Sequence, residues 1–269
     1  MFKYKFVAID LDDTLLDHDL RISDRARLAI GRAKREGIYI TLSTGRMYRS
    51  ALPYARELEI DMPIITYQGA LVKNPSSGET LAHYPLALDY ARKVIARVKS
   101  LGYHINIYIS DTLYIEKRTP HSDRYEKISG IAAQSVGDLL TFLEEAPTKV
   151  LISAEEHQLD RLTEEFGPMF GKNVHITKSK PYFLEFSHPL GTKGHALSVL
   201  AEKYGVLREE VIAIGDSYND LEMIDYAGLG VIVSNARQEL KRHADYVTTA
   251  PSGDGVAEVI EKFIFGTGF

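Results

Sequence analysis

The stretch FVAIDLDDT at residues 6–14 joins a short apolar run to three aspartates. Residues 6–9 are uncharged and partly β-branched, which predicts a buried strand. Asp10 and Asp12 come directly after that strand. Carboxylates in this position either cap a loop or take part in chemistry, so the rest of the sequence has to decide between the two.

Helices and strands alternate on the C-terminal side of this stretch. Ser23 is predicted to cap a helix that runs to Glu36, and the apolar residues 38–43 form a second predicted strand. A helix-like segment at 46–58 and a third strand at 63–67 follow. Strands separated by helices at this spacing predict a parallel sheet with right-handed crossovers.

The pattern changes near residue 70 and returns near residue 190. A hairpin is predicted at 70–84, and hairpins mixed with helices continue to about residue 188. We therefore expect an α/β protein with a Rossmann-like parallel-sheet core and helices on both faces of that sheet. Residues 1–83 and 189–269 are predicted to form the core, and residues 84–188 an inserted α+β cap with an antiparallel sheet.

Composition narrows the class of protein. The chain has 269 residues, of which 45% are hydrophobic and 26% charged, as in ordinary globular proteins. A net charge of −5 disfavours nucleic acid as a partner, and the absence of cysteine excludes disulfides and thiolate chemistry. The sequence contains no apolar signal core and no apolar stretch of membrane-spanning length, so we expect no membrane association and a cytoplasmic location.

Polar residues follow several of the predicted core strands. Ligands of open parallel sheets bind at the carboxyl ends of the strands, so these residues should meet at one edge. The residues expected there are Asp10, Asp12, Thr44, Gly45, Arg46, Lys193, Asp216, Asn219 and Asp220.

This set of side chains suits phosphoryl transfer. Clustered carboxylates repel one another, and a hard cation such as Mg²⁺ removes that repulsion. Phosphoryl transfer needs the same cation together with donors to the phosphoryl oxygens, and an aspartate can be the nucleophile. Taken singly, Asp10 could cap a loop and Lys193 could be a surface lysine; complementary groups at four separate places favour the chemical interpretation.

These residues resemble the haloacid dehalogenase superfamily. DLDDTL at 10–15 resembles its first motif, and STGR at 43–46 its second, in which Thr44 is the phosphate-binding hydroxyl. Lys193 resembles the third motif, and GDSYND at 215–220 the fourth. The order of the motifs and the insertion between the second and third are similar to the Cof-type subfamily, whose cap is of the C2 class.

The resemblance implies a mechanism. Asp10 attacks phosphorus to form an aspartyl-phosphate, and Asp12 protonates the leaving oxygen and then activates water. Mg²⁺ is expected on the Asp10 side chain, the Asp12 backbone carbonyl and Asp216. The residues expected to bind substrate are Thr44, Gly45, Arg46, Lys193 and Asn219, with Asp220 supporting Lys193 or the metal.

The chain departs from the family pattern at Gln68, where Asn is usual before Gly-Ala, so substrate preference could differ. The cap is expected to act as a lid that contacts the leaving group. Its polar and aromatic candidates, none of which is assigned to the cleft from sequence, are Tyr108, Tyr114, Glu116, Lys117, Arg118, His121, Tyr125 and Tyr182.

The expected function is therefore that of a Mg²⁺-dependent phosphatase acting on small phosphorylated metabolites, with sugar phosphates as the expected class. Two alternatives remain open at this point. One is a sugar phosphomutase, which returns the phosphoryl group to a sugar. The other is a catalytically silent protein that binds phosphometabolites. The sequence does not indicate an oligomeric state.

Overall fold

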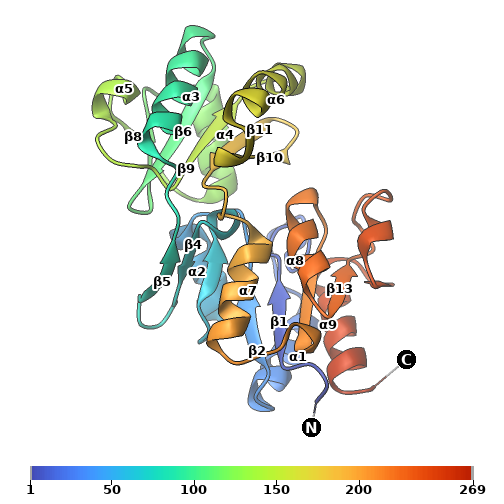
Figure 1. Ribbon diagram of the computed structural model, residues 1–269. Helices are drawn as coiled ribbons and strands as arrows, with labels where there is room; N and C mark the ends of the chain where they lie inside the picture. The colour runs from blue at the N-terminus through green and yellow to red at the C-terminus, as the bar shows by residue number, and fades with distance from the viewer. Residues whose placement is uncertain (1, 268–269) are drawn as a thin grey trace.

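The structure, a computed structural model, describes residues 2–267 and consists of two stacked units (Figure 1). The lower unit carries both ends of the described chain. The chain enters the upper unit after β5 (Thr80–His83) and returns to the lower unit before α7 (Lys193–Lys203). Within residues 2–267, no helix has the length and apolar character that crossing a membrane requires.

The lower unit is built on a five-stranded parallel sheet of order β14-β13-β12-β1-β2. Strand β1 lies between β12 and β2 and is completely buried, with Phe6 opposite Val211 of β12 on one side and Tyr39 of β2 on the other. The chain leaves β1 towards β2 and later reaches β12 on the opposite side, so the direction of strand order reverses between β1 and β12. Ligands of open α/β sheets bind at such a reversal. The strand bounds are β1 Phe6–Ile9, β2 Tyr39–Leu42, β12 Val211–Gly215, β13 Leu229–Ile232 and β14 Tyr246–Val247.

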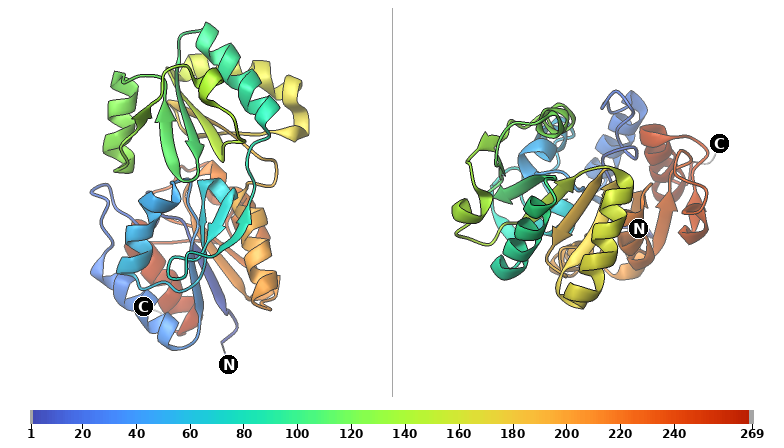
Figure 2. Two further views of the ribbon diagram at one scale, coloured as in Figure 1. Left: turned by 90° about the vertical axis from the view of Figure 1, so that its left-hand side faces the viewer. Right: turned by 90° about the horizontal axis from the view of Figure 1, so that it is seen from above.

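Helices cover both faces of this sheet, as predicted (Figure 2, left). Helix α1 (Asp24–Arg35) packs against α9 (Ser252–Val259) on one side, and α7 packs against α8 (Leu221–Tyr226) on the other. The Ser23 hydroxyl accepts a hydrogen bond from the backbone N–H of Ala26, which confirms the predicted N-cap. Helix α2 (Tyr48–Glu57) is shorter than the predicted 46–58.

The third predicted strand differs from expectation in its pairing. Strand β3 (Ile64–Thr66) pairs antiparallel with β4 (Leu71–Lys73), which pairs antiparallel with β5 in a separate three-stranded sheet. A single parallel bridge between Ser43 and Ile65 links it to the end of β2. The reason is local: the chain turns back through Tyr67 and Gln68, both at positive φ, and so returns beside β3.

The upper unit is a six-stranded sheet of order β10-β11-β9-β6-β7-β8, antiparallel except for the β7–β8 pair. All strands of this sheet lie within residues 104–187. The exact limits of the cap, residues 84–188, stay a prediction. The helices and strands of the upper unit are α3 Leu88–Ser100, β6 His104–Ile109, β7 Thr112–Ile115, α4 Pro120–Ser129, β8 Gln134–Ser135, α5 Leu139–Phe142, β9 Lys149–Ser153, α6 Glu156–Phe170, β10 His175–Lys180 and β11 Phe183–Ser187.

The two faces of the upper sheet have different partners. Alternate residues of β6, such as Ile105 and Ile107, pack with the apolar faces of α3 and α6. The opposite face presents Tyr108, Leu151 and Phe183, which belong to the same apolar cluster as the core of the lower unit. That face of the cap therefore lies over the lower unit, with α3 and α6 on the far side (Figure 2).

Candidate active site

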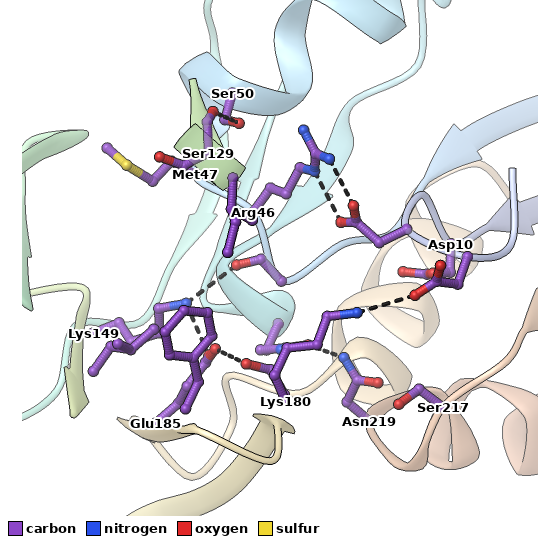
Figure 3. Close-up of a pocket in the computed structure, with 18 of the residues that line it drawn as sticks. Asp10, Arg46, Met47, Ser50, Ser129, Lys149, Lys180, Glu185, Ser217 and Asn219 are labelled. Carbon is purple, nitrogen blue, oxygen red and sulfur yellow. Dashed lines mark hydrogen bonds and ion pairs between the residues drawn. The ribbon is translucent and has the colours of Figure 1, made fainter. Parts of the chain in front are cut away.

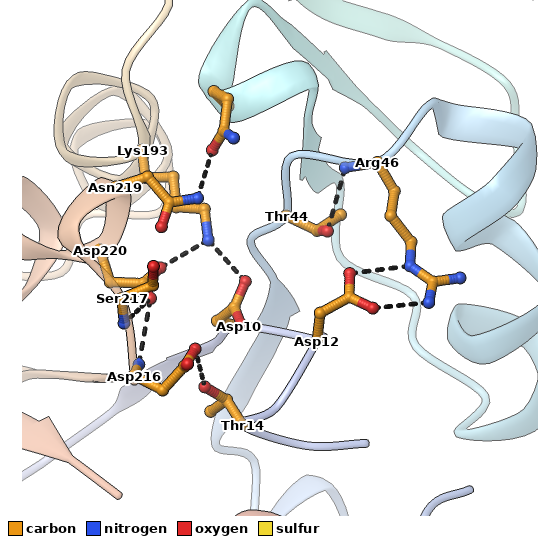
Figure 4. A network of polar contacts seen from close by, with 11 residues as sticks. Asp10, Asp12, Thr14, Thr44, Arg46, Lys193, Asp216, Ser217, Asn219 and Asp220 are labelled. Atoms are coloured by element: carbon orange, nitrogen blue, oxygen red, sulfur yellow. Dashed lines mark hydrogen bonds and ion pairs between the residues drawn. The ribbon is translucent and has the colours of Figure 1, made fainter. Parts of the chain in front are cut away.

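Three aspartates and a lysine meet where β1 and β12 end (Figure 4). Asp10 follows β1, Asp216 follows β12, and Asp220 closes the short 3-10 turn Tyr218–Asp220. One carboxylate oxygen from each lies within 4.8 Å of the others. Lys193, the first residue of α7, places Nζ 2.5 Å from Asp10 Oδ1 and 2.5 Å from Asp220 Oδ1. Residues separated by up to 210 positions thus form one cluster.

Burial controls the ionisation of this cluster. Burial raises the pKa of Asp10 well above its ordinary value, nearby Asp220 and Asp216 raise it further, and Lys193 acts in the opposite direction. Burial, with Asp220 and Asp13 nearby, raises the pKa of Asp216 to about 7. One ammonium group therefore faces three carboxylates, an excess of negative charge that fits a bound hard cation.

Asp220 uses both of its oxygens within the protein. Oδ1 accepts from Lys193, and Oδ2 accepts from the backbone N–H groups of Asp216 at 3.0 Å and Ser217 at 2.9 Å. A Cβ at Gly215 would lie 2.5 Å from the Asp220 Cβ, so the close packing requires glycine there. Asp220 therefore positions Lys193 and the loop after β12, which leaves Asp10 and Asp216 as the side chains best able to hold a metal.

Asp12 faces away from this cluster and pairs with Arg46. Arg46 donates from Nε to Asp12 Oδ2 at 2.9 Å and from Nη2 to Oδ1 at 2.6 Å (Figure 4). Although burial alone would raise the pKa of Asp12, the hydrogen bonds and charge of Arg46 lower it. Asp12 is thus held as a carboxylate, and the guanidinium of Arg46, predicted to bind substrate, is occupied by Asp12.

Thr44 lies fully buried near the start of the loop after β2. Its hydroxyl accepts a hydrogen bond from the backbone N–H of Arg46 at 3.1 Å and keeps its own proton available for donation. Neighbouring Gly45 belongs to the wall of the adjoining cleft. The phosphate-binding roles of Thr44 and Gly45 stay predictions.

The departure at Gln68 has a structural counterpart. Asn219 Nδ2 donates to Gln68 Oε1 at 2.8 Å. The side-chain amide of Asn219, which we expected to bind substrate, thus already makes one hydrogen bond to Gln68. Within residues 2–267, the buried Gln68 Nε2 and Asn219 Oδ1 have no hydrogen-bond partner. Both residues line the cleft, so the pair has one unused donor group and one unused acceptor buried beside it.

A cleft between the two units opens onto Asp10, Asp12, Asp216 and Asn219 (Figure 3). Its core side also includes Met47 and Ser50. The cap side is part polar and part apolar. The cap residues that line it are Tyr125, Ile128, Ser129, Lys149, Leu151, Ser179, Lys180, Phe183 and Glu185.

Of the eight cap candidates from sequence, Tyr125 is the one that lines this cleft. Glu116, Lys117 and His121 line a separate hollow in the cap. The others are occupied elsewhere: the Tyr108 side chain is buried, Tyr114 packs on Phe142, Arg118 pairs with Asp123 and Glu126, and Arg124 lies over the Tyr182 ring.

Lys149 and Glu185 are cleft residues that sequence reasoning missed. Both lie in strands of the cap, β9 with the sequence KVLIS and β11 with the sequence FLEFS, where apolar neighbours favour an assignment to the core. A signal was present, because a glutamate at the centre of an otherwise uncharged strand is rarely buried without a partner.

Several polar contacts join the cap to the core around the cleft. Ser50 Oγ donates to the carbonyl of Ser129 at 2.6 Å. The Tyr67 hydroxyl donates to Asp111 Oδ1 at 2.7 Å. Lys180 Nζ lies 3.0 Å from Asp13 Oδ2. These contacts hold the cap against the core around the cleft.

Comparisons with known proteins agree with this architecture. The family model described as haloacid dehalogenase-like hydrolase matches residues 7–260. A Bacillus subtilis protein named 5-amino-6-(5-phospho-D-ribitylamino)uracil phosphatase is 32% identical over 262 residues, covering 96% of each chain. The crystal structure of a haloacid dehalogenase-like hydrolase from Bacteroides thetaiotaomicron is 33% identical, with a TM-score of 0.87 and coverage of 97% of this chain and 99% of that one. A Thermotoga maritima structure is 32% identical with a TM-score of 0.84, over 96% and 97% of the two chains. The chain therefore belongs to the haloacid dehalogenase-like hydrolases, as a phosphatase of their Cof-type branch.

Proposed function

We propose that this phosphatase is Mg²⁺-dependent and hydrolyses small phosphorylated metabolites, chiefly sugar phosphates, through an aspartyl-phosphate on Asp10. The observation that carries the proposal is the contact of Lys193 with Asp10 and Asp220 beside Asp216, at the floor of the cleft. A nucleophile, a charge-stabilising cation and a set of metal ligands are thereby combined in one place.

The residues present fit a magnesium ion. The Asp10 and Asp216 side chains and the Asp12 backbone carbonyl would hold it, since hard cations prefer oxygen ligands and the carboxylates here exceed the local positive charge. When bound, Mg²⁺ supplies neutralisation of the phosphoryl charge and alignment of the phosphoryl group.

The protein's own groups carry the proton and bond changes. A carboxylate oxygen of Asp10 attacks phosphorus, the bond to the leaving oxygen breaks, and that oxygen takes a proton from Asp12. Water then attacks the phosphorus and gives its proton to Asp12, which frees Asp10 and releases phosphate. Lys193 and Thr44 donate to the phosphoryl oxygens throughout.

The pairing of Asp12 with Arg46 bears on the timing of these steps. An ionised Asp12 is ready to accept a proton from water, as the second step needs. The first step needs Asp12 to carry a proton, which requires its release from Arg46. We infer that substrate entry separates this pair and that it forms again after the leaving group departs.

Hydrolysis is favoured over mutase chemistry by the charges in the cleft. Among the described cap residues that line it, the cations Lys149 and Lys180 each pair with a carboxylate. A sugar bisphosphate, the species that a mutase must retain, is thus offered no unpaired cation on the cap side for its second phosphate. The B. subtilis relative is named for a substrate with a phosphorylated ribityl chain, which supports polyhydroxylated substrates for this chain also.

The test is phosphate release with Mg²⁺ from p-nitrophenyl phosphate and a panel of sugar and sugar-alcohol phosphates. Asp10→Asn keeps the size of the side chain and removes the nucleophile, so its rate should fall on the order of 10⁴-fold or more. Asp19→Asn, at an exposed position, is the matched control and should retain full activity. Equal rates in wild type and Asp10→Asn, or no release from any ester by the wild type, would reject the proposal.

A further inference from the structure

We propose that Glu185, held in place by Lys149, is a specificity-determining residue that binds the hydroxyl groups of the leaving group. This inference rests on the proposed phosphatase function and adds the part of the substrate that the cap recognises: a neutral, polyhydroxylated carbon chain or ring. Figure 3 shows both side chains on the cap side of the cleft, across from Asp10.

The two side chains form an ion pair inside the cap sheet. Lys149 opens β9, Glu185 lies at the centre of the neighbouring strand β11, and their exposed fractions are 2% and 3%. Nζ of Lys149 lies 2.8 Å from Oε2 of Glu185. Removing two charges from water is unfavourable, and apolar residues in place of such a pair are often neutral or stabilising. Stability alone therefore gives no reason for this pair, whereas a ligand in the adjoining cleft does.

Lys149 is committed to contacts within the protein. Besides Glu185, its ammonium donates to the carbonyl of Gly45 at 3.2 Å, in the core loop that is predicted to bind phosphate. It also lies 5.2 Å and 5.7 Å from the ring centroids of Tyr108 and Tyr67. Lys149 thus fixes Glu185 against the core loop and has little capacity left for an anionic ligand.

Glu185, in contrast, has unused acceptor capacity. Oε2 accepts from Lys149 and Oε1 accepts from Ser179 Oγ at 2.5 Å. A carboxylate offers about four acceptor sites, so about two remain beside the cleft. A carboxylate accepts and does not donate, which means that the matching ligand group must bring O–H or N–H donors and must not be an anion.

The surroundings of Glu185 suit the carbon skeleton of such a ligand. Leu151 stands opposite Glu185 on the neighbouring strand and also lines the cleft. Tyr125 and Phe183 line it as well, with ring centroids 5.6 Å apart in an edge-to-face arrangement. Acceptors beside an apolar and aromatic wall match a molecule whose surface alternates between hydroxyl groups and C–H groups.

The experiment compares kcat/KM for two kinds of ester in the wild type and in Glu185→Gln. One is p-nitrophenyl phosphate, whose leaving group has no hydroxyl besides the one released. The other is the better of glucose 6-phosphate and ribose 5-phosphate. The ratio of sugar ester to aromatic ester should fall about 10- to 100-fold in Glu185→Gln, the loss expected for hydrogen bonds to a charged acceptor. Glu165→Gln, which alters a carboxylate paired with Arg97 elsewhere in the cap, is the matched control and should leave the ratio unchanged.

The outcomes separate the two proposals. Wild-type enzyme that hydrolyses both esters, with Glu185→Gln losing both equally, would assign Glu185 a structural role and overturn this inference alone. Wild-type enzyme without activity on either ester would count against the phosphatase proposal itself.

If Glu185→Gln does not fold, Ser179→Ala keeps the ion pair and removes one contact to Glu185. It should lower the same ratio about 3- to 10-fold. The 2-deoxy forms of the two sugar phosphates give a check on the wild type alone. An unchanged ratio in Ser179→Ala, together with equal rates for the deoxy and parent sugars, would overturn the inference.

Discussion

Replacing Lys193 with methionine removes the ammonium group between Asp10 and Asp220 but keeps an unbranched side chain of similar length. In the native protein the Lys193 side chain has no exposed surface, and Nζ lies 2.5 Å from an oxygen of each carboxylate. The substitution leaves Asp10, Asp216 and Asp220 together without that cation. We expect both the free energy of unfolding and the rate of phosphate release to fall.

The magnitude follows from the burial of these groups. Removing one partner of a buried ion pair costs about 3–5 kcal/mol, because the other charge stays buried without compensation. Lys193 pairs with two carboxylates. Because burial already raises the pKa of Asp10, however, Asp10 can take up a proton in the variant, which limits the loss of stability. We therefore expect about 4 kcal/mol, close to a thousandfold change in the folding equilibrium. Loss of Lys193 as the proposed donor to the phosphoryl group should lower kcat on the order of 10²–10³-fold.

Urea denaturation at pH 7, with and without MgCl₂, measures the effect on stability. Lys203→Met changes an exposed lysine near the other end of α7, so its free energy of unfolding should stay within about 0.5 kcal/mol of the wild type. Adding Asp220→Asn to Lys193→Met should restore part of the stability and none of the activity, since one unpaired charge is removed. A loss below about 1 kcal/mol in Lys193→Met, or an equal loss in the control, would refute the reasoning.

Three further outcomes are expected. In Gly45→Ala the new Cβ would come 2.4 Å from Gln68 Nε2 and displace that amide, so kcat/KM for phosphate esters should fall about tenfold or more, as measured by phosphate release, while the thermal midpoint changes little. Glu258 is buried, which alone would raise its pKa, but hydrogen bonds from Thr249 and Tyr246 lower that pKa to about 2. The stabilising effect of the Glu258 carboxylate is therefore present above pH 4.5 and is lost as the pH falls towards 2. At pH 6, Glu258→Gln should be less stable than wild type by about 2–3 kcal/mol. Chemical denaturation should show that this difference in unfolding free energy disappears near pH 2. Removing Mg²⁺ with EDTA should abolish phosphate release and lower the unfolding free energy by about 2.7 kcal/mol relative to protein at a hundred times the dissociation constant.

Each of these expectations has an opposing result. Unchanged kinetics in Gly45→Ala would show that the Gln68 amide can move without consequence for the substrate. If the difference in unfolding free energy between wild type and Glu258→Gln did not change with pH, the Glu258 carboxylate would not be selectively stabilised in the folded state. Full activity in EDTA would remove the metal from the proposal.

Local signals account for the parts of the structure that were predicted from sequence. The N-cap at Ser23 and the buried strand before Asp10 depend on neighbouring residues, and the structure confirms both. The meeting of Asp10 and Asp216 followed from one general rule, that the carboxyl ends of parallel strands share an edge.

The features that were missed depend on contacts between distant segments. The pairing of Asp12 with Arg46 is set by the paths of two separate loops, and neither motif contains a signal for it. Strand β3 appears as one more strand of a parallel sheet until the turn at Gln68 reverses the chain. Glu185 meets Lys149 because β9 and β11 are neighbours in the cap, which no local pattern determines.

The pairing of β1 with β12 has a consequence during synthesis of the chain. Phe6 and Val211 are partners although about 205 positions separate them, so at 5–20 residues per second β1 waits roughly 10–40 s for that neighbour to be made. The cap sheet, in contrast, has all its strands once residue 187 has emerged. During that interval Asp10 terminates a strand with one unpaired edge, and such edges are open to pairing with other chains. Strand β1 thus has an edge that needs protection in the nascent protein, and a chain truncated before β12 would keep that edge exposed permanently.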